Sequence, residues 1–309
     1  MNKKNVVLSA IHFPLTMARY FWEALEDRDD VNLWVTGPFT GNWIPWNNGM
    51  TLDQKYVKQP NFPLPQSSMS QNIPASFINN QVPFPEVDLW LDIDAGWCVS
   101  GRPSKAKIFA QIQTDPHVLK DRYNKHKSQY DYSFCMQSPY QESGEIYLPY
   151  GYSKRYHFPE AVEKEYDVCM IGLNYQHRDT LARKLQAIGF KVKTGIGIVY
   201  DDYRHEYNKS KIALCWSSLQ DLPARFWEGL AMNIPVVSNR LPDIEKNGFV
   251  DMEDYIGFSS DKEAIVHINF LLANLDVAER IANSGYNKVT SGHSWDDRVQ
   301  FIMEKVGLV

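Results

Sequence analysis

Short apolar runs alternate with amphipathic stretches along the first part of the chain. Asn5–Ile11 is an apolar run of strand length, Leu15–Leu25 has helical periodicity, and Val31–Val35 reads as a second strand. A strand, a loop, a helix and a further strand in this order are typical of a parallel α/β domain. The pattern predicts three more strands in this part of the chain, at Val87–Ile93, Lys107–Ile112 and Tyr130–Met136.

Two stretches interrupt this alternation of strands and helices. Residues 36–85 are rich in Pro, Asn, Gln and Ser and show little periodicity, so we expect a functional loop region or a partly disordered segment. Leu148–Pro159 (LPYGYSKRYHFP) is rich in proline and aromatic residues, which is typical of a domain junction. Gln113–His117 is expected to be a loop at the carboxyl end of a strand, where open α/β sheets bind ligands.

Regular structure resumes after the junction. The pattern predicts five strands, at Asp167–Ile171, Phe190–Thr194, Ile212–Trp216, Val236–Ser238 and Ile256–Ser259. Helices are expected at Arg178–Ile188, Asp202–Ser210, Ala224–Met232, Asp261–Ala273, Asp276–Val289 and Trp295–Val306. Gly189 is expected to end the first of these helices in the left-handed conformation. The whole pattern predicts an α/β protein of two Rossmann-like halves that meet across a cleft.

Composition agrees with two globular domains. The chain has 309 residues, 44% of them hydrophobic and 22% charged, which is enough material for two cores. The formal net charge of −5 argues against a broadly basic surface for nucleic acid.

Cysteine usage and the absence of long apolar runs indicate a cytoplasmic protein. The start of the chain does not resemble a signal peptide, and no apolar run approaches the roughly 20 residues that span a bilayer, so we expect no membrane span. The four cysteines are scattered and suggest reduced core thiols rather than a disulfide framework or a metal site (Cys98, Cys135, Cys169 and Cys215).

The stretch 220–239, QDLPARFWEGLAMNIPVVSN, carries the candidate chemistry. Asp221 and Pro223 are expected at the N-terminus of a helix, where unpaired backbone N–H groups and a partial positive charge suit a pyrophosphate. Arg225 and Glu228 project from the same side of that helix, and a carboxylate there can accept hydrogen bonds from a ribose diol. The alternative is an ordinary surface ion pair between the two side chains.

Several segments together resemble a known family. They are VCMIGLNYQHR (168–178), PARFWEGLAMNIPVVSNR (223–240), DKEAIVHINFLLAN (261–274), VAERIANSGYNKV (277–289) and HSWDDR (293–298). In this order they resemble the C-terminal half of the GT-B glycosyltransferases, especially the spore-maturation (CgeB-like) type. The resemblance covers about residues 131–309; over residues 1–112 it consists only of strand and helix order. No single motif is specific to this family, but the order and spacing of the motifs together are.

This resemblance implies an architecture. It predicts the GT-B fold: an N-terminal acceptor domain at residues 1–155, a nucleotide-sugar-binding domain at 156–290, and a C-terminal helix at 291–309 that crosses back to the first domain.

The resemblance also implies roles for individual residues. Glu228 would bind the ribose hydroxyls, and Arg225 would lie near the phosphates. Arg178 would clamp the diphosphate with its guanidinium group, because that group binds phosphate oxygens in a fork. Gly172 corresponds to the glycine that ends the first strand of the domain. Taken alone, Arg178 could instead be a solvated helix residue.

Ser238 and Asn239 would line the nucleotide side of the cleft, although Ser238 could simply terminate a strand. The sequence also departs from the family twice. Gln220 stands where many retaining members have the first glutamate of Glu-x7-Glu, so an amide that can bind a sugar hydroxyl replaces a charge. Asn233 replaces a glycine, a mild change because asparagine tolerates the left-handed conformation.

The family generally stabilises the leaving diphosphate without a metal, and we expect neither a metal nor a cofactor. Asp92-Ile93-Asp94 is the rival metal signal, but it follows a strand of the first domain, far from the nucleotide motif. Retention of configuration is the outcome we favour, with the leaving phosphate taking the proton and Asp115 positioning the acceptor. Inversion stays open, with Asp115, His12 or Asp94 as the base. His12 could instead be a packing residue.

The substrates follow from the same resemblance. The donor would be a UDP- or GDP-linked sugar, and the acceptor a hydroxyl on a glycan, a protein, a small molecule or a modified DNA base. Residues 41–49 (GNWIPWNNG) are a candidate acceptor loop, or else a packed Ω-loop. A nicotinamide dehydrogenase is excluded because HFPLTM after the first strand contains no glycine. An epimerase, a phosphorylase or a sugar-binding protein without turnover on the same scaffold stays open.

Overall fold

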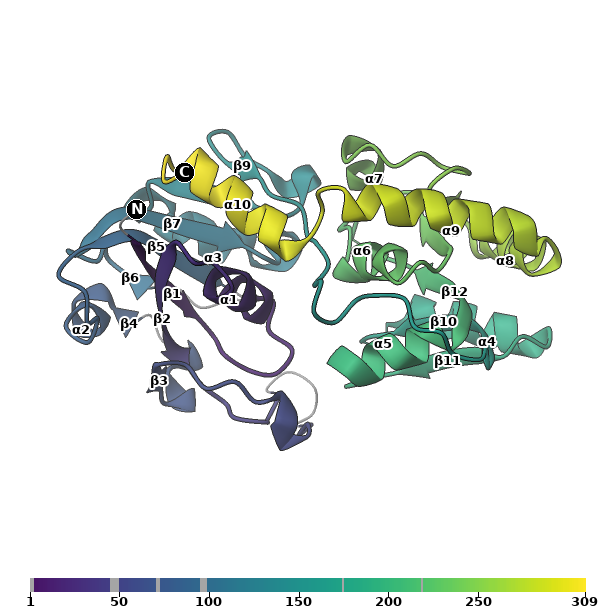
Figure 1. The fold of residues 1–309 in the computed structure, drawn as a ribbon, viewed down its shortest axis with the longest axis horizontal. Helices are drawn as coiled ribbons and strands as arrows, with labels where there is room; N and C mark the ends of the chain where they lie inside the picture. The colour runs from purple at the N-terminus through teal and green to yellow at the C-terminus, as the bar shows by residue number, and fades with distance from the viewer. Residues whose placement is uncertain (1–2, 45–49, 71–72, 95–98, 174, 218) are drawn as a thin grey trace. The chain divides into compact units, whose positions relative to one another are not determined.

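The computed structural model describes residues 3–44, 50–70, 73–94, 99–173, 175–217 and 219–309. The chain forms two compact units (Figure 1). Unit 1 consists of Met1–Pro149 and Asp296–Val309, and unit 2 consists of Tyr150–Trp295. The chain therefore leaves unit 1 once and returns to it near its C-terminus.

Unit 1 is built on a seven-stranded sheet of order β3-β2-β1-β5-β7-β8-β9, in which all neighbouring strands are parallel. Its strands are β1 (Lys4–Ala10), β2 (Val31–Pro38), β3 (Phe62–Leu64), β5 (Val87–Asp94), β7 (Ala106–Gln113), β8 (Tyr132–Cys135) and β9 (Ile146–Tyr147). A separate parallel pair joins β4 (Ile73–Pro74) to β6 (Val99–Ser100). The helices are α1 (Ala18–Glu26), α2 (Ala75–Asn79), α3 (Pro116–His126) and α10 (Trp295–Lys305).

Two expectations for unit 1 need correction. The segment expected to be a loop at Gln113–His117 includes the first residues of α3, which periodicity did not predict because the helix buries only Pro116 and Tyr123. Residues 36–85 are also more regular than expected, since they contain β3, β4, α2 and two short 3₁₀ helices, η1 (Gln54–Tyr56) and η2 (Gln66–Ser70). Two more 3₁₀ helices follow, η3 (Lys127–Gln129) and η4 (Ser138–Tyr140).

Unit 2 has a five-stranded parallel sheet of order β11-β10-β12-β13-β14. Its strands are β10 (Tyr166–Ile171), β11 (Val192–Gly195), β12 (Ser210–Cys215), β13 (Val236–Asn239) and β14 (Ile256–Phe258). Its helices are α4 (Gln176–Ala187), α5 (Tyr200–Asn208), α6 (Ala224–Ala231), α7 (Pro242–Lys246), α8 (Asp261–Ala273) and α9 (Leu275–Thr290).

Helices cover both faces of the unit 2 sheet, which explains why its strands read as continuous apolar runs. Ile212, Leu214 and Val237 belong to a buried cluster with residues of α4, α8 and α9 on one face. Because side chains alternate along a strand, Ala213 and Val236 point to the other face. There they meet α6, since a Cβ on its Gly229 would lie 3.0–3.1 Å from their side chains.

Local backbone geometry agrees with the turn chemistry expected from the sequence. Gly189 has φ +100° just after α4, and Asn233 has φ +55° between α6 and β13. The left-handed conformation is open to glycine and tolerated by asparagine, so each residue ends its helix at low cost.

Helix α10 carries the chain back into unit 1. Its Val299, Ile302 and Met303 are buried at helical spacing, and Val306, just after the helix, is buried as well. Figure 1 shows this last helix, in yellow, against the strands of unit 1.

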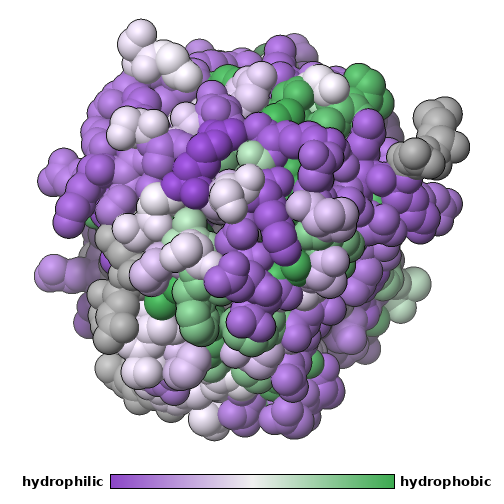
Figure 2. Space-filling view, turned by 90° about the vertical axis from the view of Figure 1, so that its left-hand side faces the viewer, coloured by the Kyte–Doolittle hydropathy of each residue, from purple (hydrophilic) through white to green (hydrophobic). Residues whose placement is uncertain are grey.

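The face in Figure 2 is mainly hydrophilic, with hydrophobic residues in small patches. No helix in the described ranges is long and apolar enough to cross a membrane.

Candidate functional site

The candidate residues of unit 2 gather at the carboxyl edge of its sheet. Gly172 follows β10 directly, Trp216 follows β12, and Asn239 is the last residue of β13. The helices α4 and α6 begin just beyond this edge and carry Arg178 and Arg225. Carboxyl ends of parallel strands meet at one edge, so residues distant in the sequence come together where open α/β sheets bind ligands.

Arg225 reaches back from α6 to Gly172. A Cβ at residue 172 would lie 2.3 Å from Arg225 Nη2, and Gly172 has φ +145°, so only glycine fits this position without strain. Arg225 Nη1 is buried and has no hydrogen-bond partner among the described residues. A buried N–H donor without an acceptor is costly, and a guanidinium group in that state favours an anion.

Arg178 is a buried residue rather than the solvated one of the alternative reading. It is 7% exposed, its Nε donates to the Trp216 carbonyl at 2.9 Å, and its Nη1 donates to the Leu173 carbonyl at 3.1 Å. Burial, with a further contribution from the charge of Arg225, lowers the pKa of Arg178 to about 10. Arg178 thus ties together the loops after β10 and β12 and places a second positive charge near Arg225.

Glu228 does not form the surface ion pair considered above. It is 7% exposed, and its Oε2 accepts a hydrogen bond from the Tyr203 hydroxyl at 2.7 Å. Its Oε1 lies 3.6 Å from His157 Nε2. Within the described part of the chain, no ion pair joins it to Arg225, so both side chains keep capacity for a ligand.

The start of α6 differs from the prediction. Pro223, not Asp221, occupies the N-cap position, and no side chain caps this helix. Asp221 instead accepts a hydrogen bond from the Ser217 hydroxyl four residues earlier. Gln220 is exposed and has φ +56°, an uncommon conformation for a residue other than glycine. The first-turn N–H groups of α6 therefore lack the side-chain cap that the sequence predicted.

Ser238 and Asn239 have local partners. Ser238 is fully buried, and its hydroxyl donates to the Asn239 carbonyl at 3.1 Å. Asn239 Oδ1 accepts from the Ser217 N–H and its Nδ2 donates to the Ser217 carbonyl, both at 2.9 Å. The amide of Asn239 thus fixes the loop after β12, which leads into α6.

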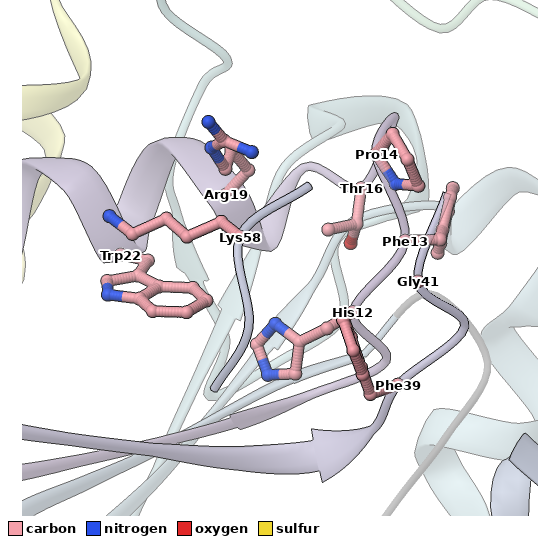
Figure 3. A pocket seen from close by; sticks show the side chains of 9 residues that line it. All are labelled: His12, Phe13, Pro14, Thr16, Arg19, Trp22, Phe39, Gly41 and Lys58. Atoms are coloured by element: carbon pink, nitrogen blue, oxygen red, sulfur yellow. The ribbon is translucent and has the colours of Figure 1, made fainter. Parts of the chain in front are cut away.

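His12 lies in a small pocket of unit 1, shown in Figure 3. The pocket is lined by Phe13, Pro14, Thr16, Arg19, Trp22, Phe39, Gly41 and Lys58 in addition to His12. His12 is 3% exposed, and its Nε2 lies 3.0 Å from the Thr36 carbonyl. The centroids of the His12 and Trp22 rings are 5.4 Å apart in a T-shaped arrangement. Burial lowers the pKa of His12 to about 4, so the ring is neutral at pH 7.

Asp92 lies within β5, and Asp115 lies just after the neighbouring strand β7. Asp115 occupies the N-cap position of α3, and its N–H donates to the Tyr123 hydroxyl at 3.2 Å. Asp92 is fully buried and accepts hydrogen bonds from the hydroxyls of Ser9 and Tyr130. Burial raises the pKa of Asp92 to about 6. It faces the core, unlike a ligand of an accessible metal.

Some of the predicted residues lie outside the described residues. The side chain of Asp94, Cys98 and residues 45–49 of the candidate acceptor loop are among them. The other three cysteines are buried thiols (Cys135, Cys169 and Cys215). Elsewhere in the described ranges, no group of three or more His, Cys, Asp or Glu side chains is arranged to hold a metal.

Solved structures with the same arrangement of elements define the class of fold. Sucrose-phosphate synthase (tll1590) from Thermosynechococcus elongatus has a TM-score of 0.62 at 10% identity, covering 98% of each chain. Anabaena Alr3699/HepE, solved with UDP and glucose, has a TM-score of 0.65 at 9% identity, covering 99% of this chain and 100% of that one. A UDP-N-acetylglucosamine 2-epimerase has a TM-score of 0.54 at 12% identity, covering 99% and 98%. The protein has the α/β GT-B fold, with two parallel-sheet domains.

A family model matches one part of the chain. Residues 155–304 match the family described as "Glycosyl transferase-like". This range contains all of the candidate residues of unit 2. No curated protein sequence matches the chain.

Tyr203 and His157 are the site residues that sequence reasoning missed. Tyr203 and Tyr207 lie four residues apart on α5 and are both buried, so their spacing predicts a buried helix face. Spacing alone does not reveal that Tyr203 contacts Glu228, because the two residues lie on different helices, α5 and α6, which are brought together only in the folded sheet domain.

Proposed function

We propose that the protein is a glycosyltransferase that moves a sugar from a nucleotide-diphosphate sugar, UDP- or GDP-linked, to an acceptor hydroxyl. The observation that carries this proposal is the buried, unpartnered Nη1 of Arg225 beside Gly172, in a GT-B fold whose unit 2 matches a glycosyl transferase-like family. Arg225 and Arg178 would bind the diphosphate, and Glu228 would accept hydrogen bonds from the ribose. On its motifs we place the chain with the spore-maturation type, and its buried thiols suit the cytoplasm.

We further propose that transfer needs no metal and retains configuration. Two guanidinium groups would stabilise the leaving diphosphate in place of a cation. Inversion needs a general base, and a histidine with a pKa of about 4 is a weak base at pH 7, which disfavours His12 in that role. The leaving phosphate would then take the acceptor's proton, with Asp115 positioning the acceptor and Gln220 binding a hydroxyl of the donor sugar.

Nucleotide binding tests the site directly. Arg225→Lys keeps the charge but removes the fork, and Glu228→Gln keeps the shape but removes the charge. We expect each to weaken UDP or GDP binding at least ~10-fold in calorimetric titration, since hydrogen bonds to charged groups are the strong ones. Arg183→Lys on the exposed face of α4 and Glu279→Gln on α9 are the matched controls and should change affinity less than ~2-fold. Unchanged affinity in both site variants would reject the assignment.

Activity assays separate transfer from the alternatives. With a panel of nucleotide sugars and trial acceptors, a transferase releases the nucleoside diphosphate and forms a glycosylated product seen by mass spectrometry. An epimerase, whose scaffold is also GT-B in the structure compared above, would convert the donor sugar without releasing the diphosphate. Tight nucleotide binding with no change in the donor would indicate a binding protein.

A further inference from the structure

Glu228 lies within a chain of buried polar groups contributed by three separate segments. The Tyr203 hydroxyl of α5 donates to Glu228 Oε2 at 2.7 Å, and His157 Nε2 lies 3.6 Å from Oε1. All three residues are at most 9% exposed. The carboxylate is thus approached on each oxygen by a different side chain, neither of which belongs to its own helix.

Tyr203 is held firmly in place. Its ring packs between those of His157, at 5.9 Å, and Tyr207, at 4.5 Å. Tyr207 is itself anchored, because its hydroxyl accepts a hydrogen bond from the Ile171 N–H at 3.3 Å, at the end of β10. The direction of the Tyr203 hydroxyl is therefore fixed relative to the strand that leads to Gly172.

His157 turns a ring nitrogen toward Glu228. Its Nδ1 accepts a hydrogen bond from the Ser153 N–H at 3.0 Å, so in the neutral ring the proton is on Nε2, the nitrogen that faces Glu228. The Tyr203 hydroxyl is the donor that binds Glu228 directly, and the His157 ring lies against the other carboxylate oxygen at 3.6 Å. An ionised carboxylate has about four lone-pair sites, so acceptor capacity is left for a diol.

We propose that Tyr203 is a positioning residue that, together with His157, orients the Glu228 carboxylate so that the site selects ribonucleotides over 2′-deoxyribonucleotides. This rests on the proposed function, in which Glu228 accepts hydrogen bonds from the ribose. A carboxylate that accepts a hydrogen bond at one oxygen from a fixed hydroxyl is held in one orientation. A carboxylate without such a bond rotates between orientations and binds a vicinal diol less well. Preorganisation of this kind acts on the ribose and not on the base or the phosphates.

The test compares ribo- and deoxyribonucleotides by calorimetric titration. UDP, dUDP, GDP and dGDP are titrated into the 309-residue protein, and the pair whose base gives the tighter binding is used thereafter. We expect the wild type to prefer the ribonucleotide at least ~10-fold. In Tyr203→Phe this ratio should fall below ~3-fold, with the deoxyribonucleotide affinity itself within ~2-fold of the wild type. Tyr255→Phe, a buried tyrosine of unit 2 far along the chain from α5, should keep the wild-type ratio.

The possible results separate the two proposals. If Glu228→Gln loses the ribose preference while folded Tyr203→Phe keeps it, Tyr203 is only structural and the inference fails while the proposed function stands. If no nucleotide binds the wild type, or Glu228→Gln keeps the full preference, both fail. If Tyr203→Phe does not fold, His157→Asn replaces it, because asparagine keeps an acceptor for the Ser153 N–H and removes the group facing Glu228. A retained preference in that variant would overturn the inference.

Discussion

At the scale of single residues, the buried candidate groups are held by partners on other segments. Glu228 and Arg178 are both 7% exposed, and each makes a hydrogen bond to a group outside its own helix. His12 is the candidate whose charge state follows from burial. It is 3% exposed, and burial lowers its pKa to about 4, so the folded state holds this ring neutral.

The depressed pKa of His12 predicts a pH-dependent contribution to stability. Between pH 6.5, the ordinary value, and about 4, the unfolded chain binds more protons at this histidine than the folded chain, so the folded state loses stability as pH falls through this window. His12→Gln keeps a donor for the Thr36 carbonyl but does not titrate. We expect the difference in unfolding free energy between wild type and His12→Gln to fall by about 2 kcal/mol from pH 7 to pH 5.

Urea titrations at both pH values measure this difference. Other titrating groups, such as Asp92 with its raised pKa, are common to both proteins and cancel. A difference that does not change with pH would show that His12 is not held neutral in the folded state.

At the scale of elements, the site depends on how closely α6 approaches the end of β10. The helix has 8 residues, and its packing against β12 and β13 through Gly229 brings Arg225 to Gly172. No flexible loop is needed to deliver this guanidinium group. Its position follows from the close contact between a short helix and the sheet.

Gly172→Ala tests this contact. The new Cβ would lie 2.3 Å from Arg225 Nη2 and the backbone has φ +145°, so we expect displacement of Arg225, at least ~10-fold weaker nucleotide binding and a stability loss of about 1–3 kcal/mol. Gly189→Ala is the matched control. It also has positive φ, +100°, but a Cβ there meets nothing within 4 Å. Both variants should lose stability, and equal nucleotide affinity in the two would argue against a role for Arg225.

At the scale of the whole molecule, the two points where the chain passes between the units are joined by hydrogen bonds. The Tyr152 N–H donates to the His293 carbonyl at 3.2 Å, and the Trp295 N–H donates to the Tyr152 carbonyl at 3.0 Å. Unit 1 ends at Pro149 and resumes at Asp296. The outgoing and returning segments thus form one paired connection.

Gly151→Ala should disturb that connection. A Cβ at residue 151 would lie 2.8 Å from the His293 carbonyl oxygen, which is backbone and cannot rotate away. We expect a stability loss of about 1–3 kcal/mol and faster cleavage of the connection in limited proteolysis. Gly292→Ala, where a Cβ meets nothing within 4 Å, should behave like the wild type. Equal cleavage of the two variants would contradict the paired arrangement.

The sequence alone predicted the α/β class, the GT-B fold and most strands and helices, because apolar periodicity and turn residues act locally. Asn233 and Gly189 were predicted in left-handed conformations for the same reason. Helix α3 was missed because its buried positions are too few to show a period. The prediction that Asp221 lies at the N-terminus of α6 as its capping residue was wrong. Its side chain accepts a hydrogen bond from Ser217 instead, and local spacing cannot choose between Ser217 and the N–H groups of the helix as its partner.

Only the tertiary structure decided which side chains meet. It placed Arg225 against Gly172 and Tyr203 against Glu228, pairs separated by 53 and 25 positions in the sequence. Hydrophobic pattern fixes which face of each element is buried, but the contacts between polar groups on different elements depend on how the sheet aligns strand ends and helices.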